Sequence, residues 1–240
     1  MNIKLIGAGS VGLFLIHILC RFLMHREEES EVTVIDGDSY EQRNSERQDF
    51  EWLGNKAEVT VEALRKKYDK RITFHAKGVF VDEGNVFLFI KEGDVVFLCV
   101  GIHDVVKLVS DHCQTLENVM CFSGGNEWSD GSVQCYIRKD GKDVTPPFTY
   151  LHPEIENPKD KNPAKLTCEE LAATSVPQLI FTNNLTAAWM LALFWSNFFL
   201  SKKEEKNWLL PTEQHKKLLS ELYFDCRTGN ARGISRKEKN

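Results

Sequence analysis

The residues best suited to chemistry in this chain of 240 residues lie close to its N-terminus. Gly7, Gly9 and Gly12 form a G-x-G-x-x-G pattern between an apolar stretch and a helical one. Glycines let a phosphate approach the backbone, and the amides at a helix N-terminus offer it partial positive charge. Asp36 follows Gly12 after 24 residues, near the spacing at which a carboxylate reaches a ribose hydroxyl. The pattern predicts a nucleotide site without saying which nucleotide.

These residues need a strand, a loop, a helix and a second strand to position them. Residues 2–7 and 32–36 are apolar and end at a glycine or an acid, as buried parallel strands do at a ligand crevice. Residues 10–24 are apolar nearly all round, which indicates a buried helix. The alternation continues with helices expected at 55–68, 82–91 and 104–116, and strands at 72–76, 94–100 and 119–123. This repetition predicts an α/β fold with a Rossmann-like, doubly wound, mainly parallel sheet.

The second half of the chain changes character. Residues 131–143 alternate in polarity and contain Asp140-Gly141, a hairpin signal, which predicts antiparallel C-terminal strands. Residues 144–163 hold five of the seven prolines and indicate a loop, too rich in proline for a helix. A long apolar helix is expected at 176–200, a strand at 221–227 and a frayed tail from residue 229.

We therefore expect one domain with four parts. Residues 1–143 form the nucleotide-binding half, and 144–175 form a crossover loop. Residues 176–228 add the long helix and the closing strand, and 229–240 form a flexible tail.

Composition and charge exclude several classes of function. The net charge is −5 and basic residues cluster only at the very end, so nucleic acid is a poor partner. The seven cysteines include no CxxC pair, and the first strand starts too early to leave room for a leader. These features predict reduced thiols, a cytoplasmic location and no structural zinc. The apolar run 189–200 is too short to span a bilayer, so a buried helix and no membrane contact are expected.

The residues after the second predicted strand are more specific than the glycine loop. Asp36, Asp38, Asn44, Arg47 and Gln48 form the pattern D-x-D-x-x-x-x-x-N-x-x-R-Q. It resembles the signature of the ThiF/MoeB/HesA family of ubiquitin-activating-enzyme-like adenylating proteins, which reads roughly D-x-D-x-V-x-x-S-N-L-x-R-Q. The resemblance implies ATP rather than a nicotinamide. It assigns the ribose to Asp36 and the phosphates to Asn44 and Arg47.

Two cations are expected to take part in catalysis. Adenylation brings a carboxylate to the α-phosphorus of ATP, and cations lower the barrier to the approach of two anions. Arg47 is the first candidate. Lys56 is the second, because it resembles the lysine of the family's G-x-x-K-[AV] element, although one residue fewer separates it from Gly54. The alternative for Lys56 is a solvent-exposed lysine at a helix start.

The largest departure from the family pattern concerns magnesium. The family usually reads C-x-D-N after the fourth strand, and its aspartate binds the magnesium of ATP. Here Cys99 and Val100 lead to Gly101, and Asp104 lies three residues further on. Either Asp104 or Asp38 is expected to replace the missing ligand; alternatively, Asp104 is only a helix N-cap. The glycine also leaves catalysis itself in question.

Cys168 resembles a cysteine that the family carries on its crossover loop in an L-T-C-x-E-A context. In the ubiquitin-activating branch this cysteine takes the activated acyl group as a thioester, whereas another branch adenylates and transfers sulfur without one. A mobile loop next to a helix start suits a reactive thiolate. The cysteines of the predicted strands and helices are expected to be small core residues: Cys20, Cys99, Cys113, Cys121 and Cys135.

The resemblance extends over most of the chain and is greatest to compact bacterial ThiF-like proteins. It implies ATP-dependent adenylation of the C-terminal carboxylate of a ubiquitin-like protein, then thioester formation on Cys168 and transfer to a conjugating protein. It also implies a homodimer formed through the helix expected at 176–200. Two alternatives stay open. One is a degenerate scaffold that binds without turnover, and the other is an NAD-dependent dehydrogenase, which leaves Asn44, Arg47 and Gln48 unexplained.

Overall fold

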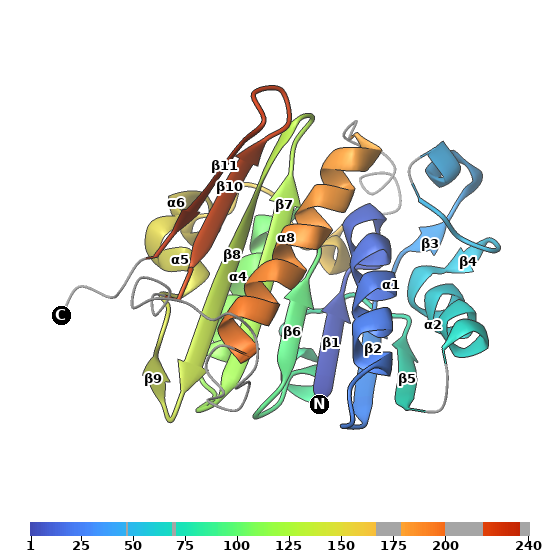
Figure 1. The fold of residues 1–240 in the computed structure, drawn as a ribbon, viewed down its shortest axis with the longest axis horizontal. Helices are drawn as coiled ribbons and strands as arrows, with labels where there is room; N and C mark the ends of the chain where they lie inside the picture. The colour runs from blue at the N-terminus through green and yellow to red at the C-terminus, as the bar shows by residue number, and fades with distance from the viewer. Residues whose placement is uncertain (47, 69–70, 167–178, 200–217, 236–240) are drawn as a thin grey trace.

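The fold is a mixed β-sheet between two layers of helices (Figure 1). The computed structural model describes residues 1–46, 48–68, 71–166, 179–199 and 218–235. Its strands follow the order β11-β10-β8-β7-β6-β1-β2-β5. The parallel part consists of β1 (Asn2–Ile6), β2 (Ser30–Ile35), β5 (Ile72–Lys77), β6 (Val95–Leu98) and β7 (Val119–Asn126). The antiparallel part consists of β8 (Asp130–Lys139), β9 (Lys142–Asp143), β10 (Glu221–Asp225) and β11 (Asn230–Ile234). The predicted Rossmann-like sheet with antiparallel C-terminal strands is confirmed.

The helices form two layers because side chains alternate between the faces of each strand. One face of the sheet is covered by α1 (Ser10–Met24), α2 (Lys56–Lys67) and α8 (Ile180–Phe199). The other is covered by α3 (Val86–Phe89), α4 (His103–Cys113), α5 (Phe148–Leu151) and α6 (Pro153–Glu156). In β6, Phe97 joins the first core, whereas Val96 and Leu98 join the second.

Helix α8 packs tightly on the sheet. Phe194 makes edge-to-face contacts with Phe97 and Phe122, with ring centroids 5.4 and 5.8 Å apart. Each buried aromatic side chain contributes about 1.5–3 kcal/mol of hydrophobic stabilisation. A Cβ on Gly124 would lie 2.4 Å from the sulfur of Met190, so a side chain there would force residues of α8 to shift.

The structure differs from the sequence expectations at three places. The proline-rich stretch holds α5, α6 and the 3₁₀ helix η2 (Pro163–Lys165), so a loop throughout was wrong. Three of its prolines stand directly before or at the first helical position, where no amide is needed: Pro147, Pro153 and Pro163. The expected fraying from residue 229 was wrong for residues 230–234, because Gly229 turns the chain and β11 pairs with β10, whereas residues 236–240 lie outside the described residues. A small ribbon of β3 (Ser39–Tyr40) and β4 (Gly54–Asn55) was not anticipated.

Other differences are shifts of element ends. The helix expected at 82–91 is the short α3, and the strand expected at 94–100 is limited to Val95–Leu98. Of the long helix expected at 176–200, residues 176–178 and 200 lie outside the described residues. Within the described ranges, no helix has both the length and the apolar character needed to cross a bilayer.

Candidate functional site

A pocket of about 210 Å³ lies where the carboxyl ends of the parallel strands meet. Strand β1 lies between β2 and β6, so chain order reverses here, which is where open α/β sheets bind ligands. The lining falls into two sets of residues. The charged residues and two of the glycines form the set that we call the polar end: Gly7, Gly9, Asp36, Asp38 and Lys56. Apolar residues line most of the rest, including Val79, Phe80, Val81, Ile102, Val105 and Pro163, together with Gly101 and Asn162.

The three glycines after β1 have different structural roles. Gly7 has a φ of +92°, and a Cβ there would lie 2.6 Å from the Cys99 carbonyl oxygen. A Cβ on Gly12 would lie 2.1 Å from the Gly7 carbonyl oxygen. Nothing lies within 4 Å of the corresponding point on Gly9. Gly7 and Gly12 therefore serve the fold, whereas Gly9 keeps space open at the N-terminus of α1, where no side chain caps the helix.

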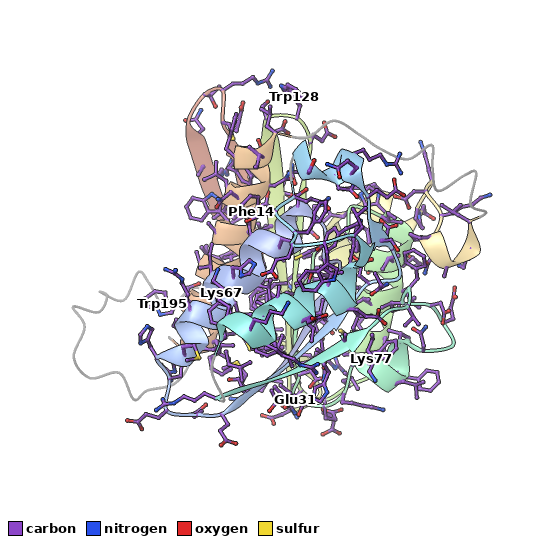
Figure 2. The ribbon with its side chains drawn as sticks, turned by 90° about the vertical axis from the view of Figure 1, so that its right-hand side faces the viewer. Phe14, Glu31, Lys67, Lys77, Trp128 and Trp195 are labelled. Carbon is purple, nitrogen blue, oxygen red and sulfur yellow. The ribbon has the colours of Figure 1, made fainter. Side chains whose placement is uncertain are left out.

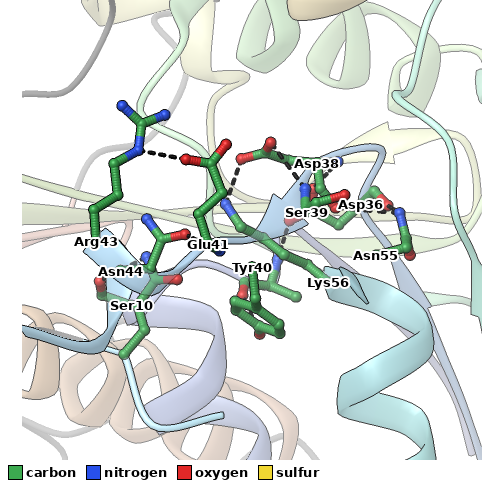
Figure 3. Close-up of polar contacts among 12 residues, drawn as sticks. Ser10, Asp36, Asp38, Ser39, Tyr40, Glu41, Arg43, Asn44, Asn55 and Lys56 are labelled. Carbon is green, nitrogen blue, oxygen red and sulfur yellow. Dashed lines mark hydrogen bonds and ion pairs between the residues drawn. The ribbon is translucent and has the colours of Figure 1, made fainter. Parts of the chain in front are cut away.

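Asp36 fastens the end of β2 to the glycine loop. Its Oδ2 accepts a hydrogen bond of 2.7 Å from the Ala8 amide, and its Oδ1 accepts one of 2.9 Å from the Asp38 amide (Figure 3). Burial raises the pKa of Asp36, and Lys56 and the two amide hydrogen bonds oppose that effect. Asp36 lines the pocket as the sequence suggested, while its contact with a ribose stays a prediction.

Lys56 is held at the pocket by Asp38. The Lys56 ammonium forms an ion pair with Oδ2 of Asp38, and the Lys56 amide donates to the Asp38 carbonyl oxygen at 2.8 Å. Only 10% of the Lys56 side chain is exposed, against 53% for Asp38. The alternative of a solvent-exposed lysine is therefore wrong. The structure brings Lys56 together with the glycine loop and Asp36.

Asn55, which the sequence analysis missed, links α2 to this loop. Its Oδ1 accepts a hydrogen bond from the Glu58 amide at 3.1 Å and so caps α2. Its Nδ2 donates to the Asp36 carbonyl oxygen at 2.9 Å. The sequence could have predicted this role, because asparagine directly before a helix is a common N-cap.

The remaining signature residues lie beside the pocket. Asn44 Oδ1 accepts from the Glu41 amide at 2.8 Å and braces the 3₁₀ helix η1 (Gln42–Glu46). Gln48 is buried and donates through Nε2 to Ser10 Oγ at 3.3 Å. Neither is among the described residues that line the pocket. Arg47 lies outside the described residues, so phosphate contacts by Asn44 and Arg47 stay predictions.

Asp104 has partners of its own, away from the glycine loop. Its Oδ2 accepts a hydrogen bond from the backbone amide of Asn162 at 2.9 Å and lies 3.4 Å from the Lys165 ammonium. The N-cap alternative for Asp104 was wrong, because Asp160 accepts from the amides of His103 and Asp104, at 2.8 and 3.0 Å. Asp104 is not among the pocket residues, and its magnesium role stays a prediction. Within the described part of the chain, no three His, Cys, Asp or Glu residues form a metal-binding group.

Two further residues that build the pocket were missed. Asn162 is fully buried, and its Nδ2 donates to the Val81 carbonyl oxygen at 2.8 Å. Tyr40 is buried beside the glycine loop, and its hydroxyl lies 2.7 Å from the Ala8 carbonyl oxygen. Neither contact leaves a local signal, because the partners lie far apart in the chain.

The cysteines of the described strands and helices are mostly core residues. Cys20, Cys113, Cys121 and Cys135 are buried, as expected, and burial raises the pKa of Cys20 to about 12. Cys99 is only partly buried and lines the pocket. Cys168, the candidate nucleophile, lies outside the described residues.

Comparisons with known proteins agree with this geometry. The ThiF family model matches residues 1–208. Among solved structures, E. coli MccB with ATP is similar with a TM-score of 0.67 at 14% identity, over 98% of this chain and 63% of that one. The microcin C7 biosynthetic enzyme MccB in complex with N-formylated MccA gives 0.68 at 16% identity, over 98% and 64%. PaaA gives 0.67 at 13% identity, over 98% and 72%.

These likenesses show a shared fold, and at such low identity they do not by themselves transfer an activity. The chain spans less than two thirds of the length of the MccB chains that it matches. A search of curated proteins found no match.

Proposed function

Since the chain belongs to the ThiF family, we propose that it is an ATP-dependent adenylating enzyme that joins AMP to the C-terminal carboxylate of a peptide or protein. The observation that carries this proposal is the polar end of the pocket. There the open Gly9 position, the N-terminus of α1 and the buried Lys56 ammonium lie together at the ends of β1 and β2. Amides and a cation in one crevice suit the phosphates of a nucleotide.

The adenylation step depends on charge neutralisation more than on acid–base catalysis. A carboxylate oxygen attacks the α-phosphorus, the bond from that phosphorus to the bridging oxygen of the β-phosphate breaks, and pyrophosphate leaves. Lys56, the first amides of α1 and Arg47 stabilise the negative charge that accumulates in the transition state. Asp36 keeps the loop in place by holding the Ala8 amide.

Magnesium fits this pocket through Asp38. Carboxylate oxygens are the ligands that magnesium prefers, and half of the Asp38 side chain is exposed at the pocket. Its Oδ2 pairs with Lys56 and its Oδ1 accepts from the Ser39 amide at 2.9 Å, so each oxygen would share its remaining lone pair with the ion. Asp104 is the other candidate from the sequence, although the Asn162 amide and Lys165 already occupy its Oδ2. When bound, the ion would supply further charge neutralisation at the phosphates.

The proposed substrate is a protein with an extended C-terminal tail, as the sequence resemblance to ubiquitin-activating enzymes implies. The related MccB has been solved with N-formylated MccA. We further propose that Cys168 accepts the acyl group as a thioester for transfer to a conjugating protein, in the cytoplasm.

We also propose that two copies associate through the surface of α8. Ile180, Phe181, Leu185 and Trp195 on that helix are large apolar residues with exposed side chains. Figure 2 places Trp195 at the lower left of the molecule and the exposed Trp128 at its upper end. Burial of such a surface favours a homodimer.

Exchange of labelled pyrophosphate into ATP tests the adenylation step. We expect exchange only when a candidate ubiquitin-like protein with a free C-terminal carboxylate is present. The same protein with an amidated C-terminus is the control and should give none. Cys168→Ala should keep the exchange and lose a covalent adduct that an added thiol cleaves by taking the acyl group. ATP binding without exchange for any free carboxylate would overturn the proposal.

A scaffold that binds without turnover is the second candidate, and Gly101 favours it. Glycine stands where the family pattern has an aspartate, and nothing lies within 4 Å of a Cβ at this position. An aspartate therefore fits. If the chain is a scaffold that lacks only a metal ligand, Gly101→Asp should create magnesium-dependent exchange where the wild type has none.

A further inference from the structure

The Ala8 peptide groups are held from two sides. The Ala8 amide donates to Asp36 at 2.7 Å, and the Ala8 carbonyl oxygen accepts from the Tyr40 hydroxyl at 2.7 Å. Ala8 is completely buried and Tyr40 is only 2% exposed.

The direction of the hydrogen bonds around Tyr40 follows from the groups present. A carbonyl oxygen can only accept, so the Tyr40 hydroxyl donates its proton to Ala8. The Thr60 hydroxyl, 3.0 Å away and nearly fully buried, must then donate to the Tyr40 oxygen. The Tyr40 ring stacks on Phe50 with centroids 4.7 Å apart and planes 6° from parallel. Burial also raises the pKa of Tyr40, so the hydroxyl keeps its proton.

The arrangement fixes the next peptide group as well. A trans peptide bond places its carbonyl oxygen and its amide hydrogen on opposite sides, and no peptide bond in the described chain is cis. With the Ala8 oxygen turned toward Tyr40, the Gly9 amide points away from Tyr40. Gly9 lines the pocket, and no described residue accepts a hydrogen bond from its amide.

We infer that Tyr40 is a positioning residue for the nucleotide: its hydroxyl, supported by Thr60, turns the Ala8–Gly9 peptide so that the Gly9 amide donates to a phosphate. This inference rests on the proposed function, because it assumes that the polar end of the pocket receives phosphates. It assigns Tyr40 no contact with the nucleotide. Its effect reaches the ligand through the backbone.

Nucleotide affinity measured by calorimetry tests the inference with Tyr40→Phe. The variant keeps the ring and its stacking, and it removes only the hydroxyl. We expect ATP to bind about three- to tenfold more weakly, the effect of one net hydrogen bond, with adenosine unchanged. Thr60→Val should shift ATP affinity in the same direction by a smaller factor. Equal losses for ATP and adenosine would indicate a merely structural role and overturn the inference.

Tyr136→Phe is the matched control. Tyr136 is as deeply buried, and its hydroxyl makes one hydrogen bond of 2.6 Å, to Asp143 on β9. Tyr136 is not among the residues of the pocket. Its variant should unfold more easily and leave the affinity for both ligands as in the wild type.

Backbone NMR separates a failure of this inference from a failure of the proposed function. In the nucleotide-free protein, Tyr40→Phe should shift the Gly9 amide resonance and lower the order parameters of Ala8 and Gly9. Inorganic tripolyphosphate should perturb the Gly9 amide of the wild type and have less effect on the variant. If wild-type protein binds tripolyphosphate but not ATP, the proposed function fails, whereas the role of Tyr40 in orienting the Gly9 amide toward a phosphate stands. Unchanged Gly9 signals in the variant overturn the inference whatever ATP does.

Discussion

The two ends of the pocket are built in different ways. The polar end is made by short segments at the ends of β1 and β2 and the start of α2, joined by hydrogen bonds to backbone groups. The apolar end is assembled from residues 79–81, 100–102, 105 and 162–163, which tertiary packing brings together. The first suits charged phosphates and the second suits a nucleobase. Changes at the polar end should therefore act on function, and changes at the apolar end should act on stability as well.

Lys56→Met should have the largest effect of the changes considered. It removes a buried cation from the phosphate end and keeps a side chain of similar length, so pyrophosphate exchange should fall by about 10²–10³-fold. Lys66→Met is the control on the same helix. Lys66 is exposed and pairs with Glu51 and Glu62 at the surface, so its loss should change stability by less than about 0.5 kcal/mol. Similar exchange rates for the two variants would remove Lys56 from the catalytic group.

The second prediction contrasts two glycines of the same loop. Gly9→Ala meets no neighbour, so the free energy of unfolding should stay within about 0.5 kcal/mol of the wild-type value. Its methyl group occupies space meant for phosphate, and ATP affinity should fall by at least about tenfold.

Gly12→Ala, by contrast, places a Cβ 2.1 Å from the Gly7 carbonyl oxygen and should destabilise the fold by about 1–3 kcal/mol. Thermal unfolding and calorimetry on both variants check the contrast. A Gly9→Ala protein that binds ATP normally would show that phosphate does not approach the loop.

The contrast between the two ends also explains what could be predicted from the sequence. The glycine loop, Asp36 and Lys56 are local patterns whose structural context repeats in many proteins, and the structure places Gly7, Gly9, Asp36 and Lys56 at the pocket. Asn162 reaches Val81 across 81 residues, and no periodicity or motif marks such a contact. Asp104 is a similar case, because the charge pattern did not show that Asp160, from a distant part of the chain, would accept the first amide hydrogen bonds of α4.

Asn162→Ala should show the structural character of the apolar end. The change removes the donor to the buried Val81 carbonyl oxygen and the acceptor for the Ala164 amide. An unsatisfied buried polar group costs about 1–3 kcal/mol, so chemical denaturation should show a loss of that size. ATP and adenosine should both bind more weakly, by a similar factor.

Asn118→Ala is the matched control for that prediction. Asn118 Oδ1 accepts from the Asp140 amide at 3.1 Å at an exposed turn far from the pocket. We expect Asn118→Ala to lower the free energy of unfolding by less than about 0.5 kcal/mol and to leave ligand affinity unchanged. If Asn162→Ala lost affinity for ATP but bound adenosine normally, a phosphate would lie at the apolar end. The assignment of the two ends would then be reversed.

The smallest effect is expected at His152, which lies outside both ends of the pocket. Its Nδ1 and Nε2 lie 2.9 Å from carboxylates of Glu154 on α6 and Glu221 on β10. Burial alone would lower the pKa of His152, but hydrogen bonds to Glu221 and Glu154 raise it overall. Because the folded pKa lies above the unfolded one, this stabilisation is complete below about pH 6.5. It is lost as the pH rises through the folded value.

Thermal unfolding measured between about pH 5.5 and 8.5 should show this loss as a fall in melting temperature. The corresponding loss in the free energy of unfolding should stay below about 1 kcal/mol. The pKa of Glu154 is lowered by a hydrogen bond from its own amide and by His152. Its contribution to the free energy of unfolding is fully present above its unfolded pKa, so that contribution is constant over this pH range. His152→Gln should flatten the profile, whereas His75→Gln, at an exposed pair with Glu31, should leave it unchanged. ATP affinity should not differ among the three proteins, because the His152 pair joins α6 to β10 and contributes no group to the pocket. A change in ATP affinity with no change in melting would mean that this pair acts on the site rather than on the fold.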